Sequence, residues 1–325
     1  MSPPVRLDLV ICTYNHAPRL GETLQALAAQ QVSEAVRWRV LIVDNNCSDD
    51  TPDVIAREAP SIAAPVETVR EARQGLNAAR LRGVRSGDGD WIAFVDDDCV
   101  LAPDWVEQAG RFALAHPDCG AFGGEVRLRW TAPPPAWVEG YGYAFAETQL
   151  GDAPQRRDWL AGAGMVLRRD ALVATGWTEH QFLEDRIGRR LVSGGDVELG
   201  LRIAARHEIW YVPQCRLQHV IPASRTERRY LRRLVFGLGV SNHDVEALIW
   251  TGSERDWWRD ARARALGHAR QGARRIAHDL RRRRPALDVA LAFAFAAGWC
   301  AGMVRLWRLG RVERRERLGS LARAA

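Results

Sequence analysis

Short apolar runs alternate with amphipathic stretches along the first 130 residues. The apolar runs predict strands at 6–15, 37–46, 66–70 and 91–98. Between and after them, apolar positions with helical spacing predict helices at 17–30, from 50, at 74–87 and at 104–115. Strands that alternate with helices of this length indicate βαβ units and a mostly parallel sheet. Because the runs are apolar almost throughout, we expect helices to cover both faces of that sheet.

The pattern becomes less regular after residue 120. Further apolar runs predict strands at 120–130, 159–169, 208–213 and 216–222. A Pro-, Gly- and aromatic-rich segment at 131–145 predicts an irregular loop. Helical spacing returns in a segment that begins with a Gly-Gly turn, 191–207, and again at 224–250. We therefore expect one α/β domain over 1–245 and a helical extension over 246–325.

Composition excludes two classes of small stabilised domain. The six cysteines are scattered without a Cys-x-x-Cys pair, which argues against a structural zinc site and a disulfide framework. The first residues enter a strand-like run without the pattern of a secretory signal. Both features favour the cytoplasm.

Basic charge is concentrated at the C-terminal end. Residues 255–325 hold 18 arginines and 6 acidic residues, a net of +12, although the whole chain has a net charge of +6. The run at 286–304 is apolar, close to the ~20 residues that span a bilayer. A packed hairpin, an interfacial helix and a spanning helix all remain open. Arginines beside an apolar helix favour contact with an anionic membrane surface, so we expect a peripheral protein at the cytoplasmic face of the inner membrane. A nucleic-acid binder leaves the acidic motifs described next without a role, and we expect no nucleic-acid partner.

Polar residues lie at the C-terminal ends of three of the predicted strands. Thr13 and Asn15 lie at the end of the first, Asp44 and Asn45 at the end of the second, and 96–98 at the end of the fourth. Ligands of open α/β sheets bind at the carboxyl ends of the strands. We therefore expect these side chains to line one site.

Three consecutive carboxylates, Asp96, Asp97 and Asp98, end the fourth strand. Carboxylates this close repel each other unless a cation compensates, and hard divalent ions prefer oxygen ligands. In an extended segment, Asp96 and Asp98 point to the same side. A solvated helix N-terminus is the alternative. The position at a strand end favours a metal site.

Three other stretches carry candidate chemistry together with a structural alternative. Asp44 can accept a hydrogen bond from a nucleobase, although the surrounding VDNNCSDD also suits a turn and a helix cap. Arg73 and Arg80 can neutralise a diphosphate, or can lie on an ordinary charged helix face. Asp196 follows two glycines at a helix start, where it is either an N-cap or a general base.

These stretches together resemble the family 2 glycosyltransferases, which have the GT-A fold, over about residues 6–245. The resemblance implies a Rossmann-like, mostly parallel sheet flanked by helices, with a C-terminal helical, basic extension. It implies that a nucleotide sugar is bound by Thr13, Tyr14, Asn15, Asp44, Asn46, Arg73, Arg80, Asp96, Asp97, Gly162 and Gly164. It further implies a metal ion, Mn²⁺ or Mg²⁺, held by Asp98, Asp96 and His219, with Arg225 nearby, and Asp196 as the catalytic base. Many members carry Glu before this Asp, whereas this chain has Gly195.

The activity expected from this resemblance is hexosyl transfer from a nucleotide-diphosphate sugar to an acceptor hydroxyl, with inversion, on a glycan or lipid-linked acceptor. A nucleotidyltransferase acting on sugar phosphates uses similar parts and is the alternative. The aromatic loop either stacks on the acceptor sugar or packs against the core; its residues are Trp130, Trp137, Tyr141, Tyr143 and Phe145.

Overall fold

The computed structural model describes residues 3–138, 140–188, 191–282 and 286–324. The chain forms two compact units, and each takes its residues from two separate stretches. Unit 1 comprises Met1–Gln181 and Leu199–Ala223, and unit 2 comprises Phe182–Glu198 and Ser224–Ala325. The domain boundary predicted at 245 lies inside a helix, Arg228–Leu248, that belongs to unit 2.

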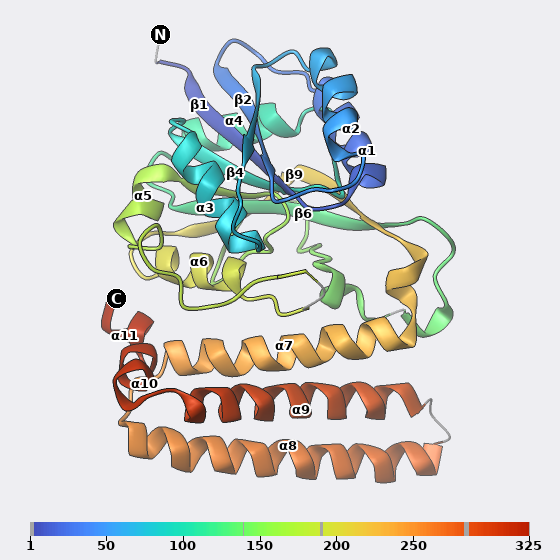
Figure 1. Ribbon diagram of the computed structural model, residues 1–325, viewed down its shortest axis with the longest axis vertical. Helices are drawn as coiled ribbons and strands as arrows, with labels where there is room; N and C mark the ends of the chain where they lie inside the picture. The colour runs from blue at the N-terminus through green and yellow to red at the C-terminus, as the bar shows by residue number, and fades with distance from the viewer. Residues whose placement is uncertain (1–2, 139, 189–190, 283–285, 325) are drawn as a thin grey trace. The chain divides into compact units, whose positions relative to one another are not determined.

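Unit 1 is built on a mixed sheet with the strand order β3-β2-β1-β4-β8-β6-β9-β5, and β7 pairs with β9 (Figure 1). The strands are β1 (Val5–Thr13), β2 (Val36–Asp44), β3 (Val66–Arg70), β4 (Trp91–Asp96), β5 (Cys99–Leu101), β6 (Ala121–Trp130), β7 (Gln155–Arg157), β8 (Met165–Arg168) and β9 (Ile209–Ile221). The first four are parallel, as the alternation of strands and helices predicts. β8 is antiparallel to β4 and β6, whereas β6 and β9 are parallel.

Helices cover both faces of this sheet. They are α1 (Ala17–Ala28), α2 (Thr51–Glu58), α3 (Leu76–Ser86), α4 (Trp105–Ala115), α5 (Arg169–Ala174) and α6 (Gly195–Ala204). One buried cluster joins α1, α2 and α4 to strand residues such as Leu9 and Ile42. A second joins α3, α5 and the end of α6 to the alternate residues, such as Val10 and Leu41. The apolar strands are thus buried on both sides, as predicted.

The strand register brings the predicted polar residues to one edge. Thr13 on β1 is paired with Asp44 on β2, and Cys12 is paired with Asp96 on β4. Gly164 continues this edge, because its N–H donates to the Phe94 carbonyl. Short 3-10 segments lie in the connections between elements, at Ala59–Ser61, Ala136–Val138, Gly142–Phe145 and Ala223–Thr226.

Three predicted boundaries differ from the structure. The strands expected at 208–213 and 216–222 form one strand, β9, because both halves pair with β6 across a register shift. The strand expected over 159–169 is limited to β8, since a turn at Gly162–Met165 precedes it. β4 ends at Asp96, and the two following carboxylates lie in a turn that leads to β5.

Unit 2 contains three long helices, α7 (Arg228–Leu248), α8 (Glu254–Arg282) and α9 (Ala286–Arg308), with α9 between the other two (Figure 1). Two short helices follow, α10 (Arg311–Arg317) and α11 (Ser320–Ala324). Glycines allow α7 and α9 to approach closely. A Cβ at Gly239 would overlap the Phe295 carbonyl oxygen, and one at Gly298 would overlap the Phe236 carbonyl oxygen.

Candidate metal and nucleotide site

The loops after β1 and β2 hold each other through side-chain contacts. The Asn15 side chain accepts from the Ser48 N–H (2.7 Å), and the Asp44 carboxylate accepts from the Cys47 N–H (2.7 Å). The Cys47 sulfur accepts from the Asn15 N–H at 3.4 Å. Both Asn15 and Asn46 have positive φ angles, 50° and 66°, which asparagine tolerates better than most residues. The loops are therefore preorganised at the sheet edge.

Asn45 fixes a third loop to the same edge. This residue is 3% exposed. Its side-chain amide donates to the carbonyls of Glu71 and Arg73, and its carbonyl oxygen accepts from the Gly75 N–H (2.8 Å) and from Gln74. Asn46 donates to the Ala72 carbonyl beside it (2.8 Å). Asn45 was expected only at a strand end, and nothing local in the sequence indicates its contacts 26 to 30 residues away.

The two predicted phosphate-binding arginines lie in different environments. Arg80 is 4% exposed, lies over the Phe94 ring at 5.3 Å, and places a guanidinium nitrogen 4.0 Å from an Asp96 oxygen. Arg73 is exposed and lines a cavity of 580 Å³ with Arg82, Arg85 and Glu179. Arg80 therefore belongs to the carboxylate cluster, and Arg73 lies on the loop that Asn45 fixes.

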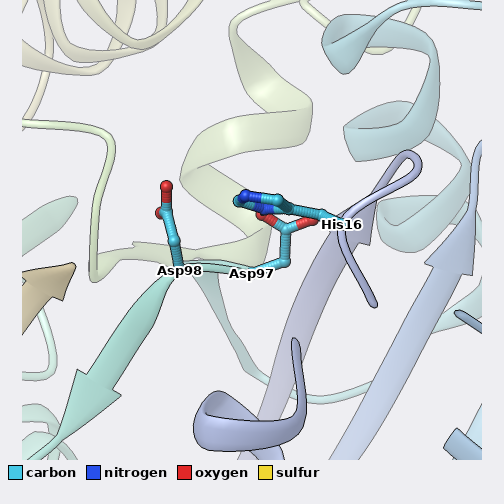
Figure 2. Close-up of side chains that lie close together, drawn as sticks. All are labelled: His16, Asp97 and Asp98. Carbon is cyan, nitrogen blue, oxygen red and sulfur yellow. The ribbon is translucent and has the colours of Figure 1, made fainter. Parts of the chain in front are cut away.

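The three carboxylates converge with a histidine that the motifs did not indicate. His16 Nδ1 lies 2.7 Å from an Asp97 oxygen. Figure 2 shows its imidazole against Asp97 and extending toward the Asp98 carboxylate. His16, Asp97 and Asp98 each bring one ligand atom within 4.8 Å of the others, and so do Asp96, Asp98 and Cys99. Asp96 and Asp98 thus converge although they are not both in one extended strand.

His219 approaches the same carboxylates from β9. Its Nε2 lies 3.4 Å from an Asp98 oxygen, and both side chains are buried. Its Nδ1 lies 2.7 Å from the Phe145 carbonyl oxygen, which can only accept, so Nδ1 carries the proton. In the neutral ring, the Nε2 lone pair then faces Asp98. A histidine held in this way is prepared as a metal ligand. Carboxylate oxygens are the ligands that Mn²⁺ and Mg²⁺ prefer, so the donor set fits either ion.

The cluster strongly disfavours ionisation of its neighbouring thiol. Burial raises the pKa of Cys99 well above its ordinary value, and the adjacent carboxylates of Asp96, Asp98 and Asp97 raise it further. Cys99 is therefore a neutral thiol beside the carboxylates, and ligation of a hard cation falls to the carboxylate oxygens and the imidazole nitrogen of His219.

The remaining predicted binding residues line the edge beside this cluster. Thr13 is buried at the end of β1, and its hydroxyl has no hydrogen-bond partner among the described residues. Tyr14 is 43% exposed. Gly164 has a φ of +74°, and a Cβ there would crowd Leu217, so the turn that contains Gly162 and Gly164 requires glycine at 164.

Asp196 lies in unit 2, in the first turn of α6, where its carboxylate accepts from the Val197 N–H. The segment before it is fixed by Glu198, which is 0% exposed and accepts from the N–H groups of Phe182 and Leu183 (2.7 Å for the latter). Arg317 donates to the Phe182 carbonyl. Arg225, expected near the diphosphate, also belongs to unit 2.

The aromatic loop places one ring in the core and another at the surface, and stacking on an acceptor sugar stays a prediction. Phe145 is buried and packs edge-on against Trp130, whereas Tyr143 is 64% exposed. Tyr143 lines a cavity of 430 Å³ in unit 1 with Trp159, Tyr211, Glu147 and Arg157. The 3-10 turn Gly142–Phe145 therefore contributes one ring to this cavity and, through the Phe145 carbonyl, orients His219.

Comparisons with known proteins find related glycosyltransferases. A family model described as Glycosyl transferase family 2 matches residues 8–158. The chain is 25% identical over 253 residues (78% of this chain, 79% of the relative) to the succinoglycan biosynthesis protein ExoM of Rhizobium meliloti. It is also 25% identical over 257 residues (77% and 80%) to a glucosyl-dolichyl phosphate glucuronosyltransferase of Haloferax volcanii.

A solved structure shares the fold. The mannosyltransferase PcManGT from Pyrobaculum calidifontis, in complex with GDP-Man and Mn²⁺, is 20% identical with a TM-score of 0.56. The alignment covers 100% of this chain and 86% of that chain. The similarity shows a GT-A fold, which confirms the predicted fold class.

Proposed function

Because the chain belongs to glycosyl transferase family 2 and is a glycosyltransferase, we propose that it is an inverting, metal-dependent enzyme. It transfers a hexosyl group from a nucleotide-diphosphate sugar to an acceptor hydroxyl in polysaccharide or glycolipid synthesis. The family match and the named glycosyltransferase relatives favour this reaction over nucleotidyl transfer. Product analysis separates the two, since glycosyl transfer releases a nucleoside diphosphate and nucleotidyl transfer releases pyrophosphate.

The donor nucleotide is assigned to the edge formed by the β1, β2 and β4 ends. Asp44 accepts from a base N–H, and the buried Thr13 hydroxyl gains a partner on binding. Asn15, Asn46, Tyr14 and Asp97 shape the same edge. Arg80, and Arg73 on the loop fixed by Asn45, carry positive charge for the diphosphate. Gly162 and Gly164 leave room for the sugar.

The metal ion is assigned to Asp98, Asp96 and His219. Bound there, Mn²⁺ or Mg²⁺ would stabilise the negative charge that develops on the departing diphosphate. Asp98 and His219 are held before the ligand arrives, Asp98 through its backbone carbonyl, which accepts from the Val220 N–H (2.8 Å), and His219 through Phe145. This rigidity limits the reorganisation required at the moment of reaction. In support, the mannosyltransferase with the same fold was solved with Mn²⁺.

Asp196 is assigned as the general base. A sugar hydroxyl is a poor nucleophile until a base removes its proton as attack proceeds. Attack on the face opposite the leaving diphosphate inverts the anomeric carbon. Glu198, in the same first turn of α6, accepts from the Phe182 and Leu183 N–H groups and is thereby engaged with backbone. Because Gly195 stands where many members have Glu, Asp196 is the carboxylate left for proton removal.

The acceptor is proposed to be a glycan or a lipid-linked sugar. Two relatives, a succinoglycan biosynthesis protein and a glucosyl-dolichyl phosphate glucuronosyltransferase, support such acceptors. The cavity beside Tyr143 and Trp159 offers aromatic faces together with Glu147 and Arg157, which suits a sugar ring and its hydroxyls. A location at the cytoplasmic face of the inner membrane is proposed with it.

The observation that carries the proposal is the convergence of Asp96, Asp98 and His219 at the edge that Asn45 and Arg80 also reach. Isothermal titration calorimetry with UDP and GDP, with and without Mn²⁺, tests it. Asp98→Asn should weaken Mn²⁺-dependent binding at least ~100-fold, since a buried ligand is lost. Asp53→Asn, an exposed change on α2, is the matched control. Metal-dependent binding that survives in Asp98→Asn contradicts the assignment.

A further inference from the structure

Helix α9 is long and apolar enough to cross a membrane, with a mean hydropathy of 1.7 over Val289–Arg308. However, its glycine face is in contact with α7. Gly298 lies against the Phe236 carbonyl, and Gly302 lies against the ring of His243. Arg305 of α9 forms an ion pair with the buried Asp244 of α7. Through these glycine and charged contacts α9 packs in a layer of helices. A lone spanning helix would instead be surrounded by lipid on all sides.

Another face of α9, away from its contacts with α7, carries an exposed apolar stripe. Its exposed positions recur at intervals of three and four residues: Phe293, Ala297, Ala301, Val304 and Trp307. Phe293 is 45% exposed and Trp307 is 65% exposed. Large apolar side chains in one exposed stripe mark an interaction surface.

A basic stripe on α8 adjoins this surface. Its arginines recur at helical spacing, with the exposed Leu266 between them: Arg255, Arg259, Arg262, Arg270 and Arg274. A cavity of 760 Å³ in unit 2 is lined by Arg255, Trp258, Arg259, Arg262, Ala263, Leu266 and Arg314, and by Trp307 of α9. No acidic residue is among the described residues that line it. Of the arginines that line this cavity, Arg259 pairs with Asp256 and Arg314 pairs with Glu254, whereas Arg255 and Arg262 form no ion pair with any residue the structure describes. The arginines at 281–284 lie outside the residues whose side chains are described.

We propose that this α8–α9 surface, the basic cavity with the apolar stripe, docks on an anionic phospholipid bilayer. The unpaired guanidinium groups contact lipid phosphates, and the exposed Trp307, Leu266 and Phe293 enter the interfacial region. Arginine beside tryptophan suits this boundary, because one side chain seeks phosphate and the other an interface between apolar and polar surroundings. Helix α9 lies on the bilayer and does not cross it. The inference goes beyond glycosyl transfer and does not depend on it.

Co-sedimentation of the full-length chain with vesicles tests the proposal. Binding is expected to vesicles that contain about 30% phosphatidylglycerol and not to pure phosphatidylcholine, and to fall at least ~10-fold in about 0.5 M NaCl, where charges are screened. The double variant Arg255→Gln/Arg262→Gln should bind at least ~10-fold more weakly. Arg229→Gln/Arg232→Gln, which removes the same charge from exposed positions of α7, should bind like the unchanged protein.

The Trp307→Ser variant tests the apolar contribution separately, because it leaves the net charge unaltered. It should weaken vesicle binding at low salt. Circular dichroism and thermal melting establish that each variant is folded. Equal binding to both vesicle types, or equal loss in the α7 control, overturns the proposal. Binding of duplex DNA to the cavity arginines in preference to vesicles also overturns it. The same holds if the protein does not bind vesicles and forms a dimer that Trp307→Ser dissociates. Sedimentation has no catalytic readout, so a failure of the proposed glycosyl transfer leaves this test intact.

Discussion

Asn45 uses its amide N–H groups and its amide oxygen on one loop, residues 71–75. Asn45→Ala leaves two part-buried carbonyls and the buried Gly75 N–H group without these partners. We expect it to lower the free energy of unfolding by about 2–3 kcal/mol. Urea denaturation measures this, with Ser48→Ala, at an exposed loop position, expected within ~0.5 kcal/mol of the unchanged protein. Equal stability of the two variants would remove Asn45 from its structural role.

Cys47 is held as a neutral thiol in the loop after β2. Burial is the largest influence and raises its pKa from 9.0 to about 11, although the hydrogen bond from Asn15 opposes the shift. At about pH 8 the thiolate fraction should be roughly 100-fold below that of the unfolded chain. Iodoacetamide labelling followed by mass spectrometry should therefore be slow at Cys47 in the folded protein and fast in urea.

The same shift has a consequence for stability. The unfolded chain releases the Cys47 proton near the ordinary thiol pKa of 9.0, whereas the folded chain retains it to about 11. The contribution of this thiol to stability is therefore complete below about pH 9 and is lost as the pH rises toward 11. Cys47→Ser should flatten that part of the pH–stability curve.

At the residue scale, the sequence correctly predicted where a side chain lies when its position along a strand determines that place. Asp44 and Asp96 follow apolar strands, and parallel pairing places them at one edge. Prediction failed where contacts with residues distant in the sequence determine the position of a side chain. His16 reaches Asp97 across 81 residues, and the orientation of His219 depends on a carbonyl 74 residues away. No local spacing encodes either contact.

At the scale of elements, the α7–α9 pair depends on glycines that no hydrophobic pattern highlights. A Cβ at Gly239 would overlap the Phe295 carbonyl oxygen, and this backbone atom cannot easily move away. Gly239→Ala should therefore destabilise unit 2 by about 1–3 kcal/mol. Gly267→Ala on α8 meets no atom within 4 Å and should stabilise by about 0.5–1 kcal/mol through helix propensity. A lower melting temperature for Gly239→Ala together with a higher one for Gly267→Ala supports close packing of α7 and α9. Melting temperatures that shift in the same direction contradict it.

Element boundaries were harder to predict than element types. The apolar pattern identifies β1, β2 and β4, because strands covered on both faces have continuous apolar runs. It divides β9 at Pro213, although pairing with β6 on both sides keeps that strand continuous. It misses β5, whose three residues, Cys99–Leu101, form a strand only because β9 lies beside them.

At the scale of the whole molecule, charge is segregated. The segment 255–325 carries a net +12, whereas the carboxylate cluster lies in unit 1. The same segregation applies to chemistry, since the residues assigned to the donor and the metal belong to unit 1 and the assigned base belongs to unit 2. The sequence indicated both sets of motifs, but it placed them in one domain ending at 245.

This division predicts that donor binding and turnover separate between two variants. Asp196→Asn keeps the shape of the side chain and removes the base, so transfer should fall by about 10²–10⁴-fold, while Mn²⁺-dependent binding of nucleoside diphosphate is retained. Asp98→Asn should lose both. Calorimetry measures binding, and release of nucleoside diphosphate in the presence of acceptor measures turnover, with Asp53→Asn as the unchanged reference. If Asp196→Asn retains turnover, proton removal belongs to another group; if it loses donor binding as well, the Asp196 side chain contributes to the donor site.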